Sequence, residues 1–109
     1  EKLDSHVNSK RIIAKKYEDF FINLNVKFLS EPSNSVSNYW LNSIIFNSSK
    51  EKESFLRYSN NNKILTRPIW TPLNRLPFLS NFQKDNLINT SFIYNRLVNV
   101  PSSVPYNKL

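Results

Sequence analysis

The chain of 109 residues contains no glycine, and this constrains its fold more than any motif that it carries. Glycine usually occupies the backbone positions with positive φ in tight turns, helix ends and phosphate-binding loops. Among the other residues, Asn and Asp adopt such positions most readily, and the chain has 17 Asn. We therefore expect Asn to replace Gly at turns, and we exclude a glycine-rich phosphate loop and a nucleophile elbow.

The first segment, residues 1–26, is predicted to form one amphipathic helix. Its apolar residues recur at intervals of three and four, which is the spacing of one helix face. These residues are Leu3, Val7, Ile13, Tyr17, Phe20, Phe21 and Leu24. Charged residues occupy positions between them, and we expect these side chains to face water. They are Lys10, Lys15, Lys16 and Glu18.

A loop and a strand are predicted next. Residues 30–38 read SEPSNSVSN, a polar run of turn formers, so we expect a loop that is mobile or faces a ligand. Residues 39–46 read YWLNSIIF, which is a strand length and is rich in aromatic and β-branched residues. Because both faces of this strand are largely apolar, we expect it to be central and covered on both sides.

Asparagines and a proline delimit the elements in the middle of the chain. Ser48 and Glu51 have the spacing of a capping box and predict a helix that ends near Ser59. Residues 60–62 are all Asn, and we expect one of them to take the left-handed conformation that usually belongs to Gly. A short strand is predicted at 63–67, where the next residue is proline.

The segment 68–77 reads PIWTPLNRLP and follows directly. Its three prolines exclude a regular helix or a central strand. Its apolar side chains do not fit a flexible linker. They are Ile69, Trp70, Leu73 and Leu76. We expect an ordered, irregular and partly buried segment.

The last predicted elements are a helix at 85–94 and a strand at 96–100, followed by an exposed tail at 102–109. Helices and strands thus alternate along the chain, with one ordered loop before the last helix. This order predicts an α+β fold in one domain, residues 1–109, with helices packed on a small antiparallel or mixed sheet.

Charge and composition limit the chemistry of the chain. The net charge of +7 favours anionic partners, but the basic residues are scattered and no RNA-binding aromatic signature accompanies them. We therefore expect no nucleic-acid partner. The absence of Cys and the single histidine, His6, argue against a metal site, and we interpret His6 as a surface residue. No apolar run approaches the roughly 18 residues of a membrane span, so we expect no membrane partner.

The segment 66–77 carries the most distinctive polar chemistry. Arg67 is a permanent cation whose fork of donors suits phosphate or carboxylate. Trp70 offers a flat surface for stacking on a sugar or base, and Asn74 suits hydroxyl recognition. We predict these three residues as substrate-binding. The alternative is a structural loop with Trp70 in the core, Arg67 in an ion pair and Asn74 bonded to the backbone.

A resemblance to a known family covers nearly the whole chain. The stretches that carry it are KRIIAKKYEDFF at 10–21, SNYWLNSIIF at 37–46, TRPIWTPLNRLP at 66–77 and RLVNVPSSV at 96–104. In this order they resemble the closing part of the DegT-like sugar aminotransferases. They are most similar to the branch that acts on nucleotide-linked amino sugars of the legionaminic acid and bacillosamine type.

Two positions refine this resemblance. Asn74 stands where many relatives have histidine, and asparagine there is associated with the legionaminic-type branch. The usual LPSG ending is VPSS at 100–103, which is a mild departure.

The resemblance implies the C-terminal small domain of a fold type I aminotransferase, which closes over the substrate and helps to pack a homodimer in the cytoplasm. In the intact family a large domain holds pyridoxal phosphate through a Schiff-base lysine and an aspartate. That enzyme moves an amino group from glutamate to a 4-keto sugar on a nucleotide diphosphate, for cell-surface polysaccharides. No motif here matches the cofactor lysine, the aspartate or the phosphate cup. We therefore predict no catalytic and no cofactor-binding residue, and an inactive fragment.

Two other interpretations stay open. The chain is also compatible with a free-standing basic module that binds nucleic acid or an anionic surface, which salt-sensitive oligonucleotide binding would favour. It is equally compatible with a structural or interaction domain whose apolar sides await a partner. The chain has no Met, and we expect it to be a piece of a longer protein.

Overall fold

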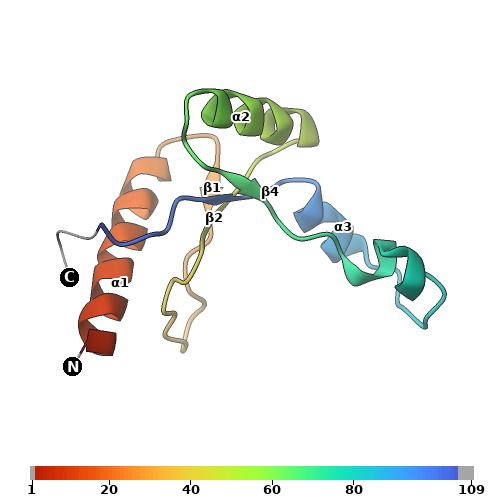
Figure 1. Ribbon diagram of the computed structural model, residues 1–109, viewed down its shortest axis with the longest axis horizontal. Coiled ribbons are helices and arrows are strands. Elements are labelled where there is room, and N and C mark those ends of the chain that lie inside the picture. The colour runs from red at the N-terminus through yellow and green to blue at the C-terminus, as the bar shows by residue number, and fades with distance from the viewer. Residues whose placement is uncertain (1, 106–109) are drawn as a thin grey trace.

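The computed structural model describes residues 2–105 and shows an α+β fold in which two long helices pack on a small sheet (Figure 1). The elements in chain order are α1 (Lys2–Phe21), β1 (Lys27–Phe28), β2 (Asn42–Ile45), α2 (Ser49–Asn61), β3 (Arg67–Pro68), two 3-10 turns (Leu73–Arg75 and Pro77–Leu79), α3 (Ile88–Tyr94) and β4 (Leu97–Val100). The predicted alternation of helices and strands is confirmed, but β1 was not predicted, and the strand predicted at 63–67 forms only at Arg67–Pro68.

The sheet is antiparallel throughout, in the order β1-β2-β4-β3. Ile44 of β2 lies opposite Val98 of β4, and neither side chain is exposed to solvent. Proline is tolerated in β3 because this strand is at the edge, where Pro68 lies opposite Val98. The predicted fold class is confirmed, and the central position of β2 with it.

The core lies on one face of the sheet. Its buried side chains are Ala14, Phe21, Phe28, Ile44, Phe46, Val98 and Val100. Phe55 and Leu56 of α2 pack against the same cluster as Ala14 and Phe21 of α1, so both long helices cover the same face. The expectation that β2 is covered on both sides is wrong, because the register turns Ser43 and Ile45 to the other face, where they are only half-buried.

The strand β2 is also shorter than the predicted 39–46. Tyr39 has a positive φ of 45°, which interrupts the extended backbone before the strand begins. The side chain of Trp40 is consequently 64% exposed, and this residue belongs to the loop.

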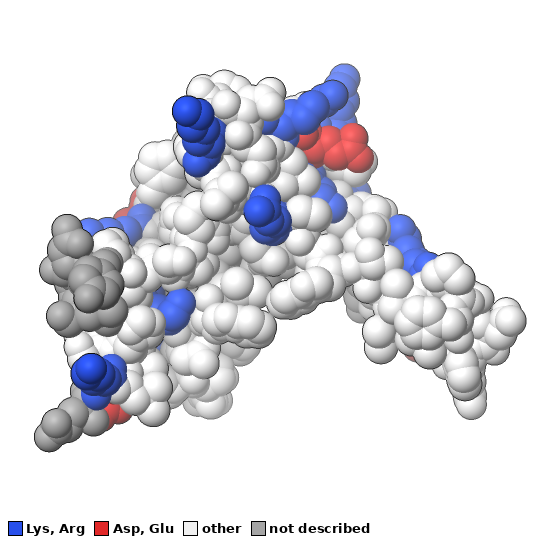
Figure 2. Space-filling model, viewed as in Figure 1, with Lys and Arg blue, Asp and Glu red and all other residues white. Residues whose placement is uncertain are grey.

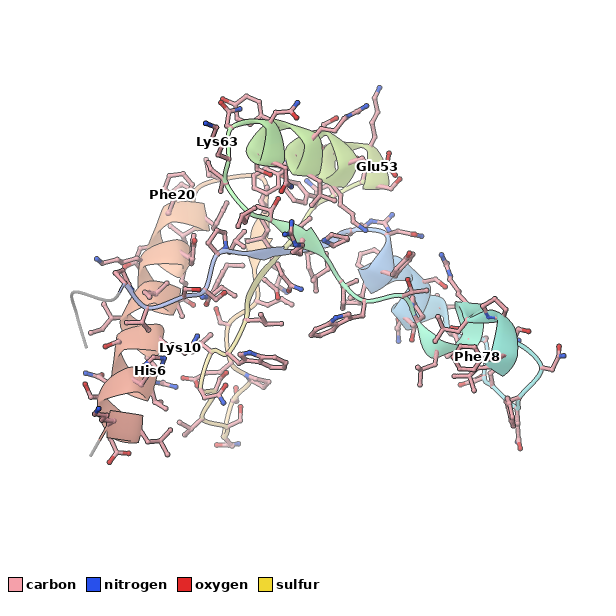
Figure 3. All side chains as sticks on the ribbon, viewed as in Figure 1. His6, Lys10, Phe20, Glu53, Lys63 and Phe78 are labelled. Atoms are coloured by element: carbon pink, nitrogen blue, oxygen red, sulfur yellow. The ribbon has the colours of Figure 1, made fainter. Side chains whose placement is uncertain are left out.

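The first helix ends earlier than predicted and buries a narrower stripe. Ala14 and Phe21 are buried, whereas Leu3 and Phe20 are 74% and 66% exposed. Figure 3 shows Phe20 at the end of α1 that is nearest to α2. Lys10 lies half-buried on the inner side, because its position continues the stripe of Ala14 and Phe21. The expectation that Lys10 faces water is therefore wrong.

The loop 30–38, which we expected to be mobile or to face a ligand, is tied to α1. Arg11 Nη1 and Nη2 donate to the two carboxylate oxygens of Glu31 at 2.9 and 2.6 Å. Arg11 also donates to the Ser37 carbonyl oxygen at 2.6 Å, and the Ser37 amide donates to Glu31 at 2.6 Å. The hydrogen bond from Arg11, together with that from the Ser37 amide, lowers the pKa of Glu31 to about 2. This polar clamp fixes the loop.

Positive φ angles occur at residues other than the expected asparagines. Asn34 follows the expectation with φ 64°, but the other three positions are Tyr39, Lys63 and Leu87. The capping box of Ser48 and Glu51 at the start of α2 is confirmed. The helix ends in a Schellman motif, in which the Lys63 amide donates to Asn60 and the Ile64 amide to Ser59. The left-handed residue is Lys63, with φ 62°, so the expectation for 60–62 is wrong by one residue.

The tail begins with an anchored residue. Ser102 is 9% exposed, and its Oγ accepts a hydrogen bond from the Asn42 amide at 2.8 Å. The expected exposure of the tail is therefore wrong at Ser102, and the expectation for residues 106–109 lies outside the described residues.

The segment 69–95 projects from the sheet as an arm that contains the 3-10 turns and α3 (Figure 1). The radius of gyration is 16.0 Å, against about 13 Å for a compact domain of about 100 residues. The arm carries exposed side chains of Leu73, Phe78 and Phe82, each more than 60% accessible. Figure 2 shows few charged side chains on the visible face of the arm. Within the segment 68–77, which we predicted to be partly buried, Ile69 and Leu76 are half-buried, whereas Trp70 and Leu73 are exposed.

Candidate functional site

A cleft of about 810 Å³ lies beside the end of β4, between α1 and the start of the arm. Four parts of the chain line it: α1, the loop before β2, the residues around β3, and the residues 99–103. The polar and aromatic side chains in the lining are Lys10, Trp40, Arg67, Trp70 and Asn99. The cleft therefore brings together residues that are up to 93 positions apart in the sequence, between Lys10 and Ser103.

Arg67 reaches the cleft from the edge strand β3, where its side chain is exposed. Its Nη1 donates to the Thr66 carbonyl oxygen at 3.3 Å and to Asn60 Oδ1 at 3.5 Å. Thr66 in turn is buried against Ser59, with 2.6 Å between the two hydroxyl oxygens. Among residues 2–105, Arg67 forms no ion pair, so its charge is available to an anion.

Trp70 lies in the cleft and not in the core, because its side chain is 68% exposed. Its ring centroid is 6.1 Å from that of Trp40, and the two ring planes are inclined by 33°. Trp40 was predicted as a strand residue, and its pairing with Trp70 was not expected. The signal that points to it is the run of turn formers at 30–38, which ends two residues before Trp40.

Lys10 forms another wall of the cleft. Its Nζ donates to the Ser102 carbonyl oxygen at 2.8 Å and to the Trp40 carbonyl oxygen at 3.4 Å. Figure 3 shows Lys10 extending from α1 toward the loop that precedes β2. None of the described residues that line the cleft is acidic. Two cations without a carboxylate beside them favour a negatively charged ligand.

Asn74 lies away from Arg67 and Trp70. It lines a separate hollow of about 480 Å³ on the arm, together with Leu73, Phe82 and Leu87. The structure thus brings two of the three predicted substrate-binding residues into one cleft and places the third beyond it.

The cleft does not fit the pyridoxal phosphate that the resemblance implies for the intact family. Lys10 is its lysine, but two backbone carbonyl oxygens already hold the ammonium group. Within the described part of the lining there is no aspartate to pair with a pyridine nitrogen. No cluster of three metal-ligating side chains occurs in residues 2–105. None of the helices in that range combines the length and apolar character that a membrane crossing requires.

The comparisons with known proteins point to one class. No family model matches the chain. Over 105 residues the chain is 29% identical to GDP-perosamine synthase of Vibrio cholerae, in an alignment that covers 94% of this chain and 29% of that protein. The sequence therefore supports a relationship to one part of the sugar aminotransferases.

Two solved structures share the fold. The aminotransferase TlmJ from Streptoalloteichus hindustanus matches with a TM-score of 0.78 at 14% identity, over 88% of this chain and 26% of that one. Helicobacter pylori PseC, an aminotransferase involved in the biosynthesis of pseudoaminic acid, matches with a TM-score of 0.77 at 16% identity, over 94% of this chain and 29% of that one. The chain thus spans less than a third of the length of the proteins that it matches.

Proposed function

We propose that this chain is the C-terminal small domain of a cytoplasmic, pyridoxal-phosphate-dependent aminotransferase that aminates a nucleotide-linked 4-keto sugar for cell-surface polysaccharides. The observation that carries the proposal is the similarity to GDP-perosamine synthase over 94% of the chain. We assign the legionaminic acid and bacillosamine branch on the PLN sequence that ends at Asn74. The large domain supplies the cofactor chemistry and, in a homodimer, part of the substrate site.

Within that enzyme the cleft described above faces the substrate. Arg67 is aimed at the charged part of the nucleotide sugar, because its guanidinium is exposed and has no carboxylate partner in the described residues. Trp70 offers its exposed ring to the sugar or base. Asn74, on the arm, contacts the substrate only if the ligand extends past the cleft or the arm moves toward it.

A chimera tests the proposal. In the Vibrio cholerae enzyme the part that aligns with this chain is replaced by residues 1–109. We expect the chimera to bind pyridoxal phosphate, seen as an absorption band near the visible edge, and to transfer an amino group from glutamate to a nucleotide-linked 4-keto sugar. The matched control is the same enzyme without the replaced part, which should be inactive. A folded, cofactor-loaded chimera without transfer would contradict the proposal.

The isolated chain supplies a second test. Incubated with pyridoxal phosphate, it should produce no cofactor band and no amino transfer. A stable band would show a cofactor site within these residues and would overturn the assignment to a small domain.

A further inference from the structure

The arm, residues 69–95, is attached to the sheet without a core of its own. α3 and the two 3-10 turns, which all lie within the described residues, contain no buried residue. A segment with so few buried side chains is normally mobile about its points of attachment. The angle between the arm and the sheet (Figure 1) therefore has to be fixed by specific contacts where the arm begins and ends.

Two connections join the arm to the sheet, and they are stiffened in different ways. The outgoing connection contains Pro68 and Pro72, whose rings fix the φ angle. The returning connection begins at Tyr94 and has no proline. Its Arg96 donates from Nε to the Asn47 carbonyl oxygen at 3.1 Å, which ties the residue before β4 to the residue before the cap of α2. The returning connection therefore depends on side-chain contacts at the end of α3.

Tyr94, the last residue of α3, is contacted by two cations from different parts of the chain. Lys52 comes from α2, where its Nζ donates to the Tyr94 carbonyl oxygen at 2.6 Å and lies 5.0 Å from the centroid of the Tyr94 ring. Arg75 comes from the first 3-10 turn of the arm, and its Cζ lies 4.6 Å from the same centroid. Both distances are within the limit of about 6 Å for a cation–π contact. One tyrosine therefore connects α2 with the turn at Leu73–Arg75.

Lys52 is placed at a cost that the core of the fold does not require. It is 8% exposed although it carries a charge, and it forms no ion pair among residues 2–105. Burial of an ammonium group is unfavourable unless other contacts replace its hydration. The contacts of its Nζ with described residues are both with Tyr94. The position of Lys52 on the inner side of α2 thus serves the attachment of the arm.

We infer that Lys52, Tyr94 and Arg75 form a brace that keeps the arm at a fixed angle to the sheet and thereby positions Asn74. Asn74 is in the same 3-10 turn as Arg75 and directly precedes it, so a shift of Arg75 moves Asn74 as well. Lys52 and Arg75 are positioning residues, because they act through Tyr94 and this turn. The use of Asn74 for substrate rests on the proposed function, whereas the rigidity of the arm does not depend on it.

Two spin labels measure the angle of the arm, and they can be attached at introduced cysteines because the sequence has none of its own. Asn81→Cys places one label on the arm and Asn61→Cys places the other at the end of α2, and both positions are exposed. Pulsed electron paramagnetic resonance gives the distribution of distances between the labels. We expect one narrow distance in the parent chain and its loss in Lys52→Met and in Tyr94→Leu. Tyr94→Phe should keep it, because the aromatic ring and the carbonyl oxygen remain.

A second label pair separates the brace from a general loosening of the fold. Lys16→Cys on α1 and Asn61→Cys on α2 report on the two long helices alone, and their distance should stay narrow in every variant. Lys50→Met is the matched control for Lys52→Met, because Lys50 is exposed on the same helix. The urea midpoint of Lys52→Met should equal or exceed that of the parent, since an apolar side chain replaces a buried charge. A merely structural lysine would instead give a lower midpoint and an unchanged arm distance.

Three results would overturn the brace. They are a broad arm distance in the parent chain, an arm distance that stays narrow in folded Lys52→Met and Tyr94→Leu, and equal broadening of both label pairs. The chimera separates the brace from the proposed function. If Asn74→Ala raises the KM of an active chimera for the nucleotide sugar and Lys52→Met does not, the brace does not position Asn74. If Asn74→Ala leaves the KM unchanged, the substrate role of Asn74 is refuted alone, and the label distances decide on the brace.

Discussion

The buried side-chain amide of Asn42 leads to a quantitative prediction about the stability of this fold. Asn42 is 1% exposed on β2, on the face that the helices cover, and lies opposite Val100. Its side-chain nitrogen and oxygen have no hydrogen-bond partner in the described structure. Leaving a buried polar group unpaired costs about 1–3 kcal/mol. Replacement by leucine, which has the same branching, removes that cost and adds apolar contact with the core.

Leucine is somewhat larger than asparagine, and the resulting overpacking should lower the free energy of unfolding by about 1 kcal/mol. We therefore expect Asn42→Leu to raise the free energy of unfolding by about 1–2 kcal/mol. For a domain of this size the melting temperature should rise by about 4–8 °C per kcal/mol. Urea unfolding followed by circular dichroism at 222 nm measures the free energy, and an unchanged m-value establishes that the unfolded state is the same.

The companion variant Asn42→Asp should change the free energy of unfolding in the opposite direction. It has the same shape but places a carboxylate in the core, which is strongly unfavourable without a partner. It should be less stable than the parent at neutral pH and recover partly on acidification, when the carboxyl group is neutral. If the urea midpoint of Asn42→Leu is equal to or lower than that of the parent, the side-chain amide of Asn42 has a hydrogen-bond partner in solution and the reasoning fails.

Three further predictions concern local features. Lys63→Gly should raise the free energy of unfolding by about 1 kcal/mol in urea titrations, because Lys63 holds a φ of 62° that glycine adopts without strain. Ser48→Ala should lower it by about 1 kcal/mol through loss of the helix cap. Glu31 has a folded pKa of about 2, below its ordinary value of about 4.3, so the folded state binds fewer protons between these values. The free energy of unfolding should therefore fall as the pH drops from about 4.5 to 2. Glu31→Gln should lack this part of the fall in the same titrations.

The elements that local sequence determines were predictable. The capping box at Ser48 and Glu51 is a contact between residues three apart, and it formed as expected. The strand at 96–100 is bounded by its own composition and forms at Leu97–Val100. Arg67 and Trp70 lie in one cleft. This was predictable because the two residues are only three positions apart, in a segment that prolines make rigid.

Features that depend on distant contacts were not predictable. Lys10 interrupts an apolar stripe in the sequence and was predicted to face water. Its Nζ instead donates to the carbonyl oxygen of Ser102, 92 positions away. Trp40 looked like a strand residue because its neighbours favour strands, and only the positive φ of Tyr39 separates it from β2. β1 has only two residues, which is too short for a strand pattern to be recognised in the sequence. Lys10 and Trp40 could therefore be assigned to the cleft only from the three-dimensional structure.

The apolar side chains of the segment 68–77, at the start of the arm, were predicted to be partly buried, but Trp70 and Leu73 are exposed. Apolar composition reflects what a segment buries in its final assembly, whereas exposure in this chain reflects only its own 109 residues. Phe78, labelled in Figure 3, is 74% exposed near the end of the arm. A small domain without its large domain and an interaction domain without its partner would both leave such a surface open. The arm is thus common to both interpretations, and an experiment that separates them has to address the cleft, where two exposed tryptophans lie beside Lys10 and Arg67.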